Sequence, residues 1–155
     1  MKTKILKKVM TFKDAVETTP DVANGYQVGL NAIDNKYRSK IQPSDTRLLN
    51  GSVDIDYCTA ILYPNDNRWD YAISYNQKVY FVEVHSANTR EVSVVLNKLK
   101  WLKGWLFQHA PNINSLKASQ PYFWIQSKGF AIIPNSPQYK KIVQKGLKPI
   151  AILKL

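Results

Sequence analysis

The sequence predicts a single α/β domain that spans residues 1–155, with a central mixed sheet flanked by helices. Residues 52–85 alternate between apolar and polar side chains in three segments separated by turn residues, which predicts a three-stranded antiparallel meander. Residues 92–106 place apolar side chains at the spacing of an amphipathic helix. A chain of 155 residues with 45% apolar residues is long and apolar enough to bury one core.

The predicted elements begin with a helix over Thr11–Thr18, in which Phe12, Ala15 and Val16 form an apolar stripe. Residues 22–43 are rich in Asn, Asp, Gly and Lys, and their weak periodicity predicts an irregular segment.

Three strands follow. Residues 52–63 alternate and are rich in β-branched and aromatic residues, and turn residues at 64–67 end this first strand. The second strand is predicted over Trp69–Tyr75. The dipeptide Asn76-Gln77 then offers a tight connection into the third strand, Lys78–His85.

The long helix is predicted to begin after Asn88 and Glu91, which have the spacing of a capping box, and to end near His109. Beyond it, Pro121–Gln126 and Phe130–Ile133 predict a strand or hairpin.

Ser136–Lys145 predicts a short helix stopped by Gly146, and Lys148–Leu153 predicts a last strand. The complete order is therefore α-β-β-β-α-β-α-β.

The positive charge of the chain is concentrated in its second part. Residues 86–155 contain eleven Lys or Arg against one acid, whereas residues 1–85 contain eleven against ten acids. This asymmetry predicts a polyanionic partner, nucleic acid before an anionic membrane, unless the lysines only keep the surface soluble. The predicted nucleic-acid contacts lie on the long helix and on the last helix: Lys98, Lys100, Lys103, Lys140 and Lys141.

Trp101 and Trp105 lie four residues apart on the long helix, among these lysines. They form either a surface on which bases stack, or a contact for a second copy of the chain or another protein, or part of the core. The sequence leaves these three interpretations open.

Several classes of protein are excluded or disfavoured. The chain has no apolar run of the length that crosses a membrane, and no phosphate-binding loop, dinucleotide-binding motif, nucleophile elbow or zinc-ligand pattern. Its single cysteine, Cys58, excludes an internal disulfide and fits a reducing compartment. The lysines at the N-terminus interrupt every apolar run, so we expect no signal peptide and a cytoplasmic protein.

The third predicted strand carries the strongest indication of a chemical site. Alternation places Val79, Phe81, Glu83 and His85 on one face of this strand. Burying a carboxylate among apolar side chains costs on the order of several kcal/mol unless a metal, a cation or hydrogen bonds compensate its charge. Glu83 therefore requires a partner.

The pattern of acids in the meander resembles that of the PD-(D/E)xK nuclease superfamily, which has the restriction-endonuclease-like fold. Asp70 opens the second strand, and Glu83-Val84-His85 lies near the end of the third, where the family has its (D/E)-x-K motif. The predicted order of elements is similar to the core of that fold. His85 stands where the family has lysine.

The resemblance implies a metal-dependent nuclease. Asp70 and Glu83 would bind Mg²⁺ or Mn²⁺, the Val84 carbonyl would add a third oxygen, and Glu17 of the first helix would be the family's auxiliary acid.

The missing lysine leaves two alternatives open. His85 lacks a permanent positive charge, so a cation from the following helix, Lys98 or Lys100, would have to replace the lysine. Otherwise the chain is a degenerate member that binds nucleic acid, or a protein in a toxin, immunity or mobile-element system, without catalysis.

Overall fold

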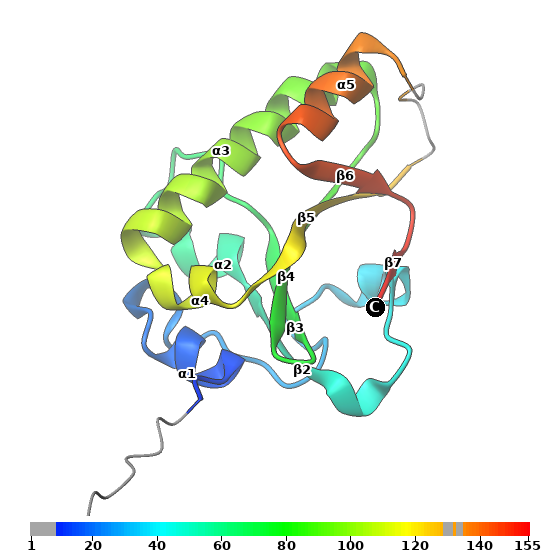
Figure 1. The fold of residues 1–155 in the computed structure, drawn as a ribbon. Coiled ribbons are helices and arrows are strands. Elements are labelled where there is room, and N and C mark those ends of the chain that lie inside the picture. The colour runs from blue at the N-terminus through cyan, green and yellow to red at the C-terminus, as the bar shows by residue number, and fades with distance from the viewer. Residues whose placement is uncertain (1–8, 129–131, 133–134) are drawn as a thin grey trace, which may run out of the picture.

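A computed structural model describes residues 9–128, 132 and 135–155 of the chain, which form a mixed sheet with helices packed against it (Figure 1). The α-helices are α1 (Phe12–Glu17), α2 (Ile55–Thr59), α3 (Val92–His109), α4 (Pro111–Ser115) and α5 (Pro137–Gln144). The strands are β1 (Ile41–Gln42), β2 (Leu49–Asp54), β3 (Tyr71–Tyr75), β4 (Lys78–His85), β5 (Lys117–Gln126), β6 (Leu147–Ile150) and β7 (Leu153–Lys154). Short 3-10 helices are η1 (Pro20–Val22), η2 (Asn35–Lys40), η3 (Thr46–Leu48) and η4 (Thr89–Glu91).

The main sheet has five strands in the order β2-β3-β4-β5-β6. β2, β3 and β4 are antiparallel neighbours, whereas β5 runs parallel to both β4 and β6. β1 and β7 form a separate parallel pair. The predicted α/β class with a mixed sheet is therefore confirmed.

The β3–β4 hairpin fixes the register of the strands that carry Asp70 and Glu83. Asn76 and Gln77 both adopt positive φ angles, of 49° and 59°, as a two-residue hairpin turn requires. Tyr75 consequently pairs with Lys78, and Tyr71 pairs with Val82. The start of β3 and the end of β4 therefore lie at the same end of the sheet.

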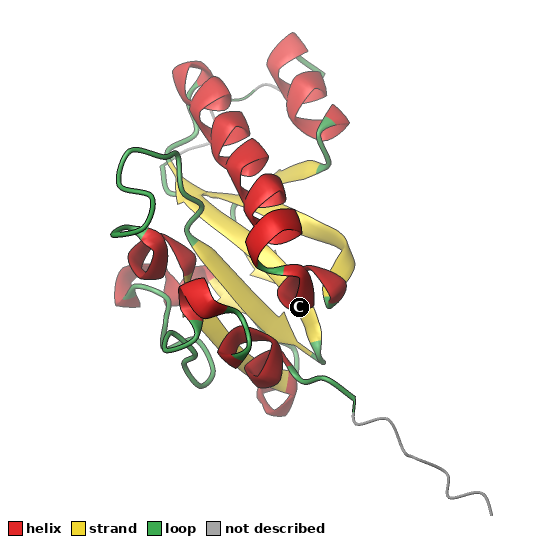
Figure 2. Ribbon diagram, turned by 90° about the vertical axis from the view of Figure 1, so that its left-hand side faces the viewer, coloured by secondary structure: helices red, strands yellow, loops and turns green. Residues whose placement is uncertain are grey.

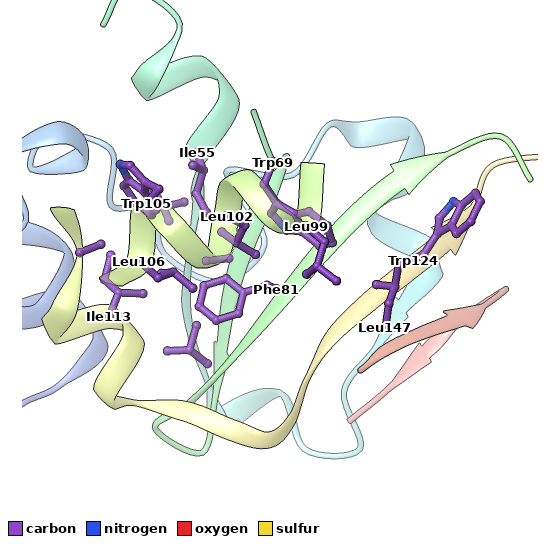
Figure 3. Close-up of a cluster of buried hydrophobic side chains, with 14 of the residues drawn as sticks. Ile55, Trp69, Phe81, Leu99, Leu102, Trp105, Leu106, Ile113, Trp124 and Leu147 are labelled. Atoms are coloured by element: carbon purple, nitrogen blue, oxygen red, sulfur yellow. The ribbon is translucent and has the colours of Figure 1, made fainter. Parts of the chain in front are cut away.

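Helix α3 covers one face of the sheet (Figure 2). Its side chains Leu99, Leu102 and Leu106 are buried and face Phe81 of β4 (Figure 3). Burial of apolar side chains of this size contributes about 2 kcal/mol each. The α3 side of the sheet is thus the larger core, and Glu83 shares this face with Phe81 because the two residues are two positions apart in one strand.

The opposite face of the sheet is covered by the irregular segment after η1 and by the C-terminal strand. Ile73, Val82 and Ile125 of the sheet are buried there with Ile33 and Leu153. The predicted irregular segment over residues 22–43 is largely confirmed, although it includes η2 and the short β1. Among the described residues, no helix is both long and apolar enough to cross a membrane.

The first predicted strand, residues 52–63, is wrong beyond Asp54. The Asp54 carboxylate accepts a hydrogen bond of 2.9 Å from the Tyr57 N–H and so caps α2. Residues 55–59 are rich in strand-forming types, but this local cap and the packing of Ile55 in the core stabilise a helix instead.

Helix α4 was not predicted, whereas α5 and β5 agree with the prediction except at their boundaries. Helix α5 begins after Ser136, whose hydroxyl accepts a hydrogen bond from the Tyr139 N–H, and it ends before Gly146, which has a φ of 78°. β5 is longer than predicted, and the hairpin predicted over Phe130–Ile133 lies outside the described residues apart from Ile132. The last predicted strand is divided into β6 and β7.

Candidate active site

Two carboxylates and one ammonium group meet at the end of the sheet where β3 begins and β4 ends. The Lys98 Nζ of helix α3 donates a hydrogen bond to Glu83 Oε1 and lies 3.9 Å from Asp70 Oδ1. Glu83 is fully buried, and the side chains of Asp70 and Lys98 are about four-fifths buried. We call these three residues the acid–lysine cluster.

Backbone hydrogen bonds hold the two carboxylates in a reciprocal arrangement. The Asp70 N–H donates to Glu83 Oε2 at 3.0 Å, and the Val84 N–H donates to Asp70 Oδ2 at 3.0 Å. Asp70 also anchors the neighbouring chain, because its carbonyl oxygen accepts the Ile55 N–H at 2.8 Å. The cluster is therefore a built site whose carboxylates are fixed by main-chain groups of adjacent strands.

Burial governs the electrostatics of the two acids. The pKa of Glu83 is raised to about 8, first by burial and then by the Asp70 charge, whereas Lys98 opposes the shift. Burial also raises the pKa of Asp70, and the positive charge of Lys98 again opposes the shift.

For the pKa of Lys98, burial and the neighbouring charges act in the opposite directions to those for the two acids. Burial alone would lower the pKa of Lys98, but the carboxylates of Glu83 and Asp70 outweigh burial, so the pKa is raised. With Glu83 protonated below a pH of about 8 and Lys98 charged, the buried cluster carries less negative charge than two ionised carboxylates would, which a low-dielectric environment favours.

His85 does not join the cluster. Its Nε2 lies 2.7 Å from Glu91 Oε2, and its carbonyl oxygen accepts a hydrogen bond of 3.0 Å from the Trp124 indole. The capping box predicted for Asn88 and Glu91 is therefore wrong, because the Glu91 side chain binds His85 and the Asn88 side chain makes no capping hydrogen bond.

Glu17, predicted as an auxiliary acid, lies away from the cluster. It is exposed at the end of α1 and lies 4.0 Å from Lys13. The Phe12 N–H at the start of this helix donates to Gln77, in the hairpin turn at the other end of β3 and β4. Among the described residues, no hydrogen bond or ion pair joins Glu17 to the cluster.

Two polar side chains near the cluster were not singled out as site residues by sequence reasoning. The charge of Asp56 in α2 raises the pKa of both Asp70 and Lys98, and Asp56 itself accepts a 2.8 Å hydrogen bond from Arg68. Gln126 pairs with His85 in strand register and is buried, and neither polar atom of its side chain has a hydrogen-bond partner among the described residues. No sequence signal marks Gln126, because its burial depends on which strands lie beside β5.

The two carboxylates of the cluster suit a divalent cation that keeps part of its water shell, but not one enclosed by protein ligands alone. Among the described residues, no group of three or more acidic, histidine or cysteine side chains converges as a metal cage. Asp70 and Glu83 provide two carboxylates, and Mg²⁺ is commonly bound by one or two carboxylates with water completing its shell. The Val84 carbonyl as a third oxygen ligand stays a prediction.

The predicted nucleic-acid contacts separate into two groups. Lys98 lies in the acid–lysine cluster, whereas Lys100, Lys103, Lys140 and Lys141 are exposed on α3 and α5. Trp101 is partly exposed. Trp105 is only 3% exposed and its indole donates to Asp21 at 2.9 Å, so the prediction of a surface contact is wrong for Trp105 and its alternative as a core residue is confirmed.

No protein-family model matches this chain, and no curated protein or solved structure is significantly similar to it. The resemblance to PD-(D/E)xK nucleases therefore stays a prediction, and the function has to be argued from the geometry of the cluster.

Proposed function

We propose that the chain is a nucleic-acid-binding protein whose acid–lysine cluster is the active centre of a metal-dependent phosphodiesterase. The observation that carries this proposal is that Lys98 of α3 reaches both Asp70 and Glu83. The Lys98 ammonium thus lies beside two acids at the same end of the sheet. It supplies the positive charge that the motif lysine would supply and that His85 lacks. The sheet order and the long helix after β4 are consistent with the restriction-endonuclease-like core.

The residues divide the chemistry between them. A Mg²⁺ or Mn²⁺ ion bound by Asp70 and Glu83 would supply Lewis-acid activation of the scissile phosphate and of water. Lys98 provides a positive charge that stabilises the negative charge developing on the phosphoryl oxygens. In hydrolysis the water oxygen bonds to phosphorus and the bond from phosphorus to the leaving oxygen breaks; the leaving oxygen takes up one proton, and the other of the two water protons is released to solvent.

The raised pKa of Glu83 gives this proposal a pH dependence. A cation that binds Glu83 must displace the proton that this carboxyl group holds below a pH of about 8. We therefore expect the affinity for Mg²⁺ or Mn²⁺ to rise with pH up to about 8 and then to level off.

The test is cleavage of labelled single-stranded and duplex DNA and RNA with Mn²⁺ or Mg²⁺, together with metal titration by calorimetry. We expect Glu83→Gln and Lys98→Met each to lower cleavage by about 100-fold or more, because each removes a group that acts on the transition state. Glu17→Gln is the matched control and should cleave like the wild type, since Glu17 is exposed and outside the cluster. Wild-type protein that binds neither metal contradicts the proposal.

A second candidate is favoured by the position of the Lys98 ammonium beside both carboxyl groups, where it offsets part of their negative charge without a metal. In that case the chain is a degenerate member that binds nucleic acid, or a protein partner through the exposed part of the α3 surface, and does not cleave. Nucleic-acid binding that is equal with Mg²⁺ and with EDTA, and without cleavage, would select this candidate.

A further inference from the structure

Helix α3 separates two hollows on the surface of the molecule. One, of about 630 Å³, opens between α3 and the loop after α2 and is lined by aromatic rings and by the amide side chains of Asn65, Asn67, Asn97 and Gln108. The other, of about 450 Å³, lies on the side of α3 that faces α5. Asn97 and Lys100 line both hollows, so the two are adjacent across the helix.

The aromatic hollow has walls that are held in place before any ligand binds. Trp101 stacks on Trp105 with ring centroids 5.8 Å apart, and Tyr63 meets the edge of Trp101 at 5.9 Å. The Trp101 indole donates to Asp66 at 3.0 Å, and the Tyr63 hydroxyl donates to Asp21 at 2.8 Å. A planar group entering this hollow meets rigid aromatic surface, and four amides are available for hydrogen bonds to its edge.

The second hollow, which we call the lysine groove, is suited to anions. Four lysines line it, and no acidic side chain does: Lys100, Lys103, Lys141 and Lys145. Burial and the nearby charges of Lys145 and Lys117 lower the pKa of Lys103, whose ammonium donates a hydrogen bond to the Lys145 carbonyl oxygen and lies over the Tyr122 ring. An anion bound in the groove would relieve the repulsion between these charges.

We propose that α3 binds single-stranded nucleic acid, with an unpaired base in the aromatic hollow and the flanking phosphates in the lysine groove. This inference rests on the proposed nucleic-acid-binding function and specifies its ligand. Bases of a duplex are stacked and paired, whereas the faces and edges of a single strand are free to meet aromatic rings and amides.

The arrangement also places the bound strand beside the acid–lysine cluster. Lys98, Trp101 and Trp105 are spaced at i, i+3 and i+7, so they lie along one side of α3. Three residues of helix rise separate Lys98 from Trp101, about 5 Å along the axis. A nucleotide in the aromatic hollow is therefore within one helical turn of the cation that the proposed cleavage uses.

The test measures fluorescence anisotropy of a labelled oligonucleotide, single-stranded or annealed to its complement, in EDTA so that cleavage plays no part. We expect the single strand to bind more tightly than the duplex. Trp101→Ala should weaken single-strand binding by about 5- to 150-fold, the range for loss of one stacked base. Phe107→Ala, which removes an exposed aromatic ring of α3 that lines neither hollow, is the matched control and should bind like the wild type.

Salt dependence tests the lysine groove separately. The double variant Lys100→Ala/Lys141→Ala should lower the slope of log affinity against log salt by about 1.4, since each phosphate contact to a single strand contributes about 0.7. Lys78→Ala, at an exposed position at the start of β4, should leave the slope unchanged.

Intrinsic fluorescence keeps the test independent of the stability of Trp101→Ala. Trp69 and Trp124 are buried outside the hollow, so quenching of tryptophan emission by a single strand reports on Trp101 and Trp105, which line it. Quenching should occur in the wild type and be reduced in Trp101→Phe, which retains an aromatic ring but leaves only Trp105 as a tryptophan in the lining of the hollow.

The outcomes separate this inference from the proposed cleavage. Duplex binding as tight as single-strand binding, or quenching that is undiminished in Trp101→Phe, overturns the inference. Tight single-strand binding in EDTA without cleavage in Mn²⁺ supports the inference and refutes the phosphodiesterase.

Discussion

The buried carboxyl group of Glu83 should make the stability of the protein fall as pH rises. Burial raises the pKa of Glu83 from its ordinary value of 4.5 to about 8 in the folded chain. Between these values the unfolded chain releases the proton and the folded chain retains it. The unfolded state therefore binds fewer protons, so the free energy of unfolding decreases with pH in this range and is flat outside it.

The magnitude follows from the size of the shift. One pKa unit corresponds to about 1.4 kcal/mol, so the shift of Glu83 sets a ceiling of about 5 kcal/mol between pH 4.5 and pH 8. Because small domains are stable by only about 5–15 kcal/mol, even half of this loss is measurable.

Glu83→Gln removes the titrating group and nearly preserves its shape. We expect the variant and the wild type to have free energies of unfolding within about 1 kcal/mol of each other at pH 5, where the wild-type carboxyl is neutral. At pH 9 the variant should be more stable by several kcal/mol, up to the ceiling of about 5. The pKa of Asp54, which burial raises to about 6, adds the same slope to both proteins and cancels in their difference.

The assay is urea denaturation at each pH from 5 to 9, followed by tryptophan fluorescence. The free energy of unfolding should fall with urea concentration at the same slope for both proteins, so that a difference in midpoint reports a difference in stability. Glu17→Gln, at an exposed position, should follow the wild type at every pH. Parallel curves for Glu83→Gln and the wild type would refute the assignment of a buried, proton-holding carboxyl to this position.

Two further predictions concern helix α3. Lys98→Met should cost less stability at pH 5, where Glu83 is protonated, than at pH 9, where it leaves two buried acids without their cation at a cost of about 3 kcal/mol. Equal losses at both pH values in urea denaturation, with Lys100→Met as the exposed control, would contradict this. Gly104→Ala should raise the free energy of unfolding by about 1 kcal/mol through helix propensity, because no atom lies within 4 Å of the added Cβ, and a lower thermal midpoint would contradict that open space.

Local patterns in the sequence were sufficient to predict the elements that carry the cluster. The alternation in Lys78–His85 and the apolar spacing in the long helix predicted both elements and the face on which Glu83 lies. The burial of Glu83 was anticipated because its neighbours on that face are apolar. Lys98 and Lys100 were both named as substitute cations because the long helix packs on the meander, and the structure places Lys98 at the two acids while Lys100 is exposed.

The features that were missed depend on contacts that sequence periodicity does not record. Residues 55–59 resemble a strand in composition, but Asp54 caps a helix there and Ile55 is buried in the core. The spacing of Asn88 and Glu91 fits a capping box, yet the Glu91 carboxylate forms its hydrogen bond with His85 instead. The burial of Gln126 follows from the parallel placement of β5 beside β4, which is set by the whole sheet.

The cation of the cluster, Lys98, lies on a helix rather than on a strand, and this position connects it to the outer surface of α3. A lysine at position 85 would be fixed to the sheet, whereas Lys98 is fixed to α3, which also carries Trp101 and Lys100 on its outer surface. A ligand that binds this outer surface therefore contacts the same rigid helix that places the ammonium between Asp70 and Glu83. Because a helix transmits displacement along its length, any shift of α3 on binding changes the separation of charges in the cluster. If a nucleic-acid strand binds this surface as proposed, its binding and the positioning of the cluster would be coupled through one element, α3.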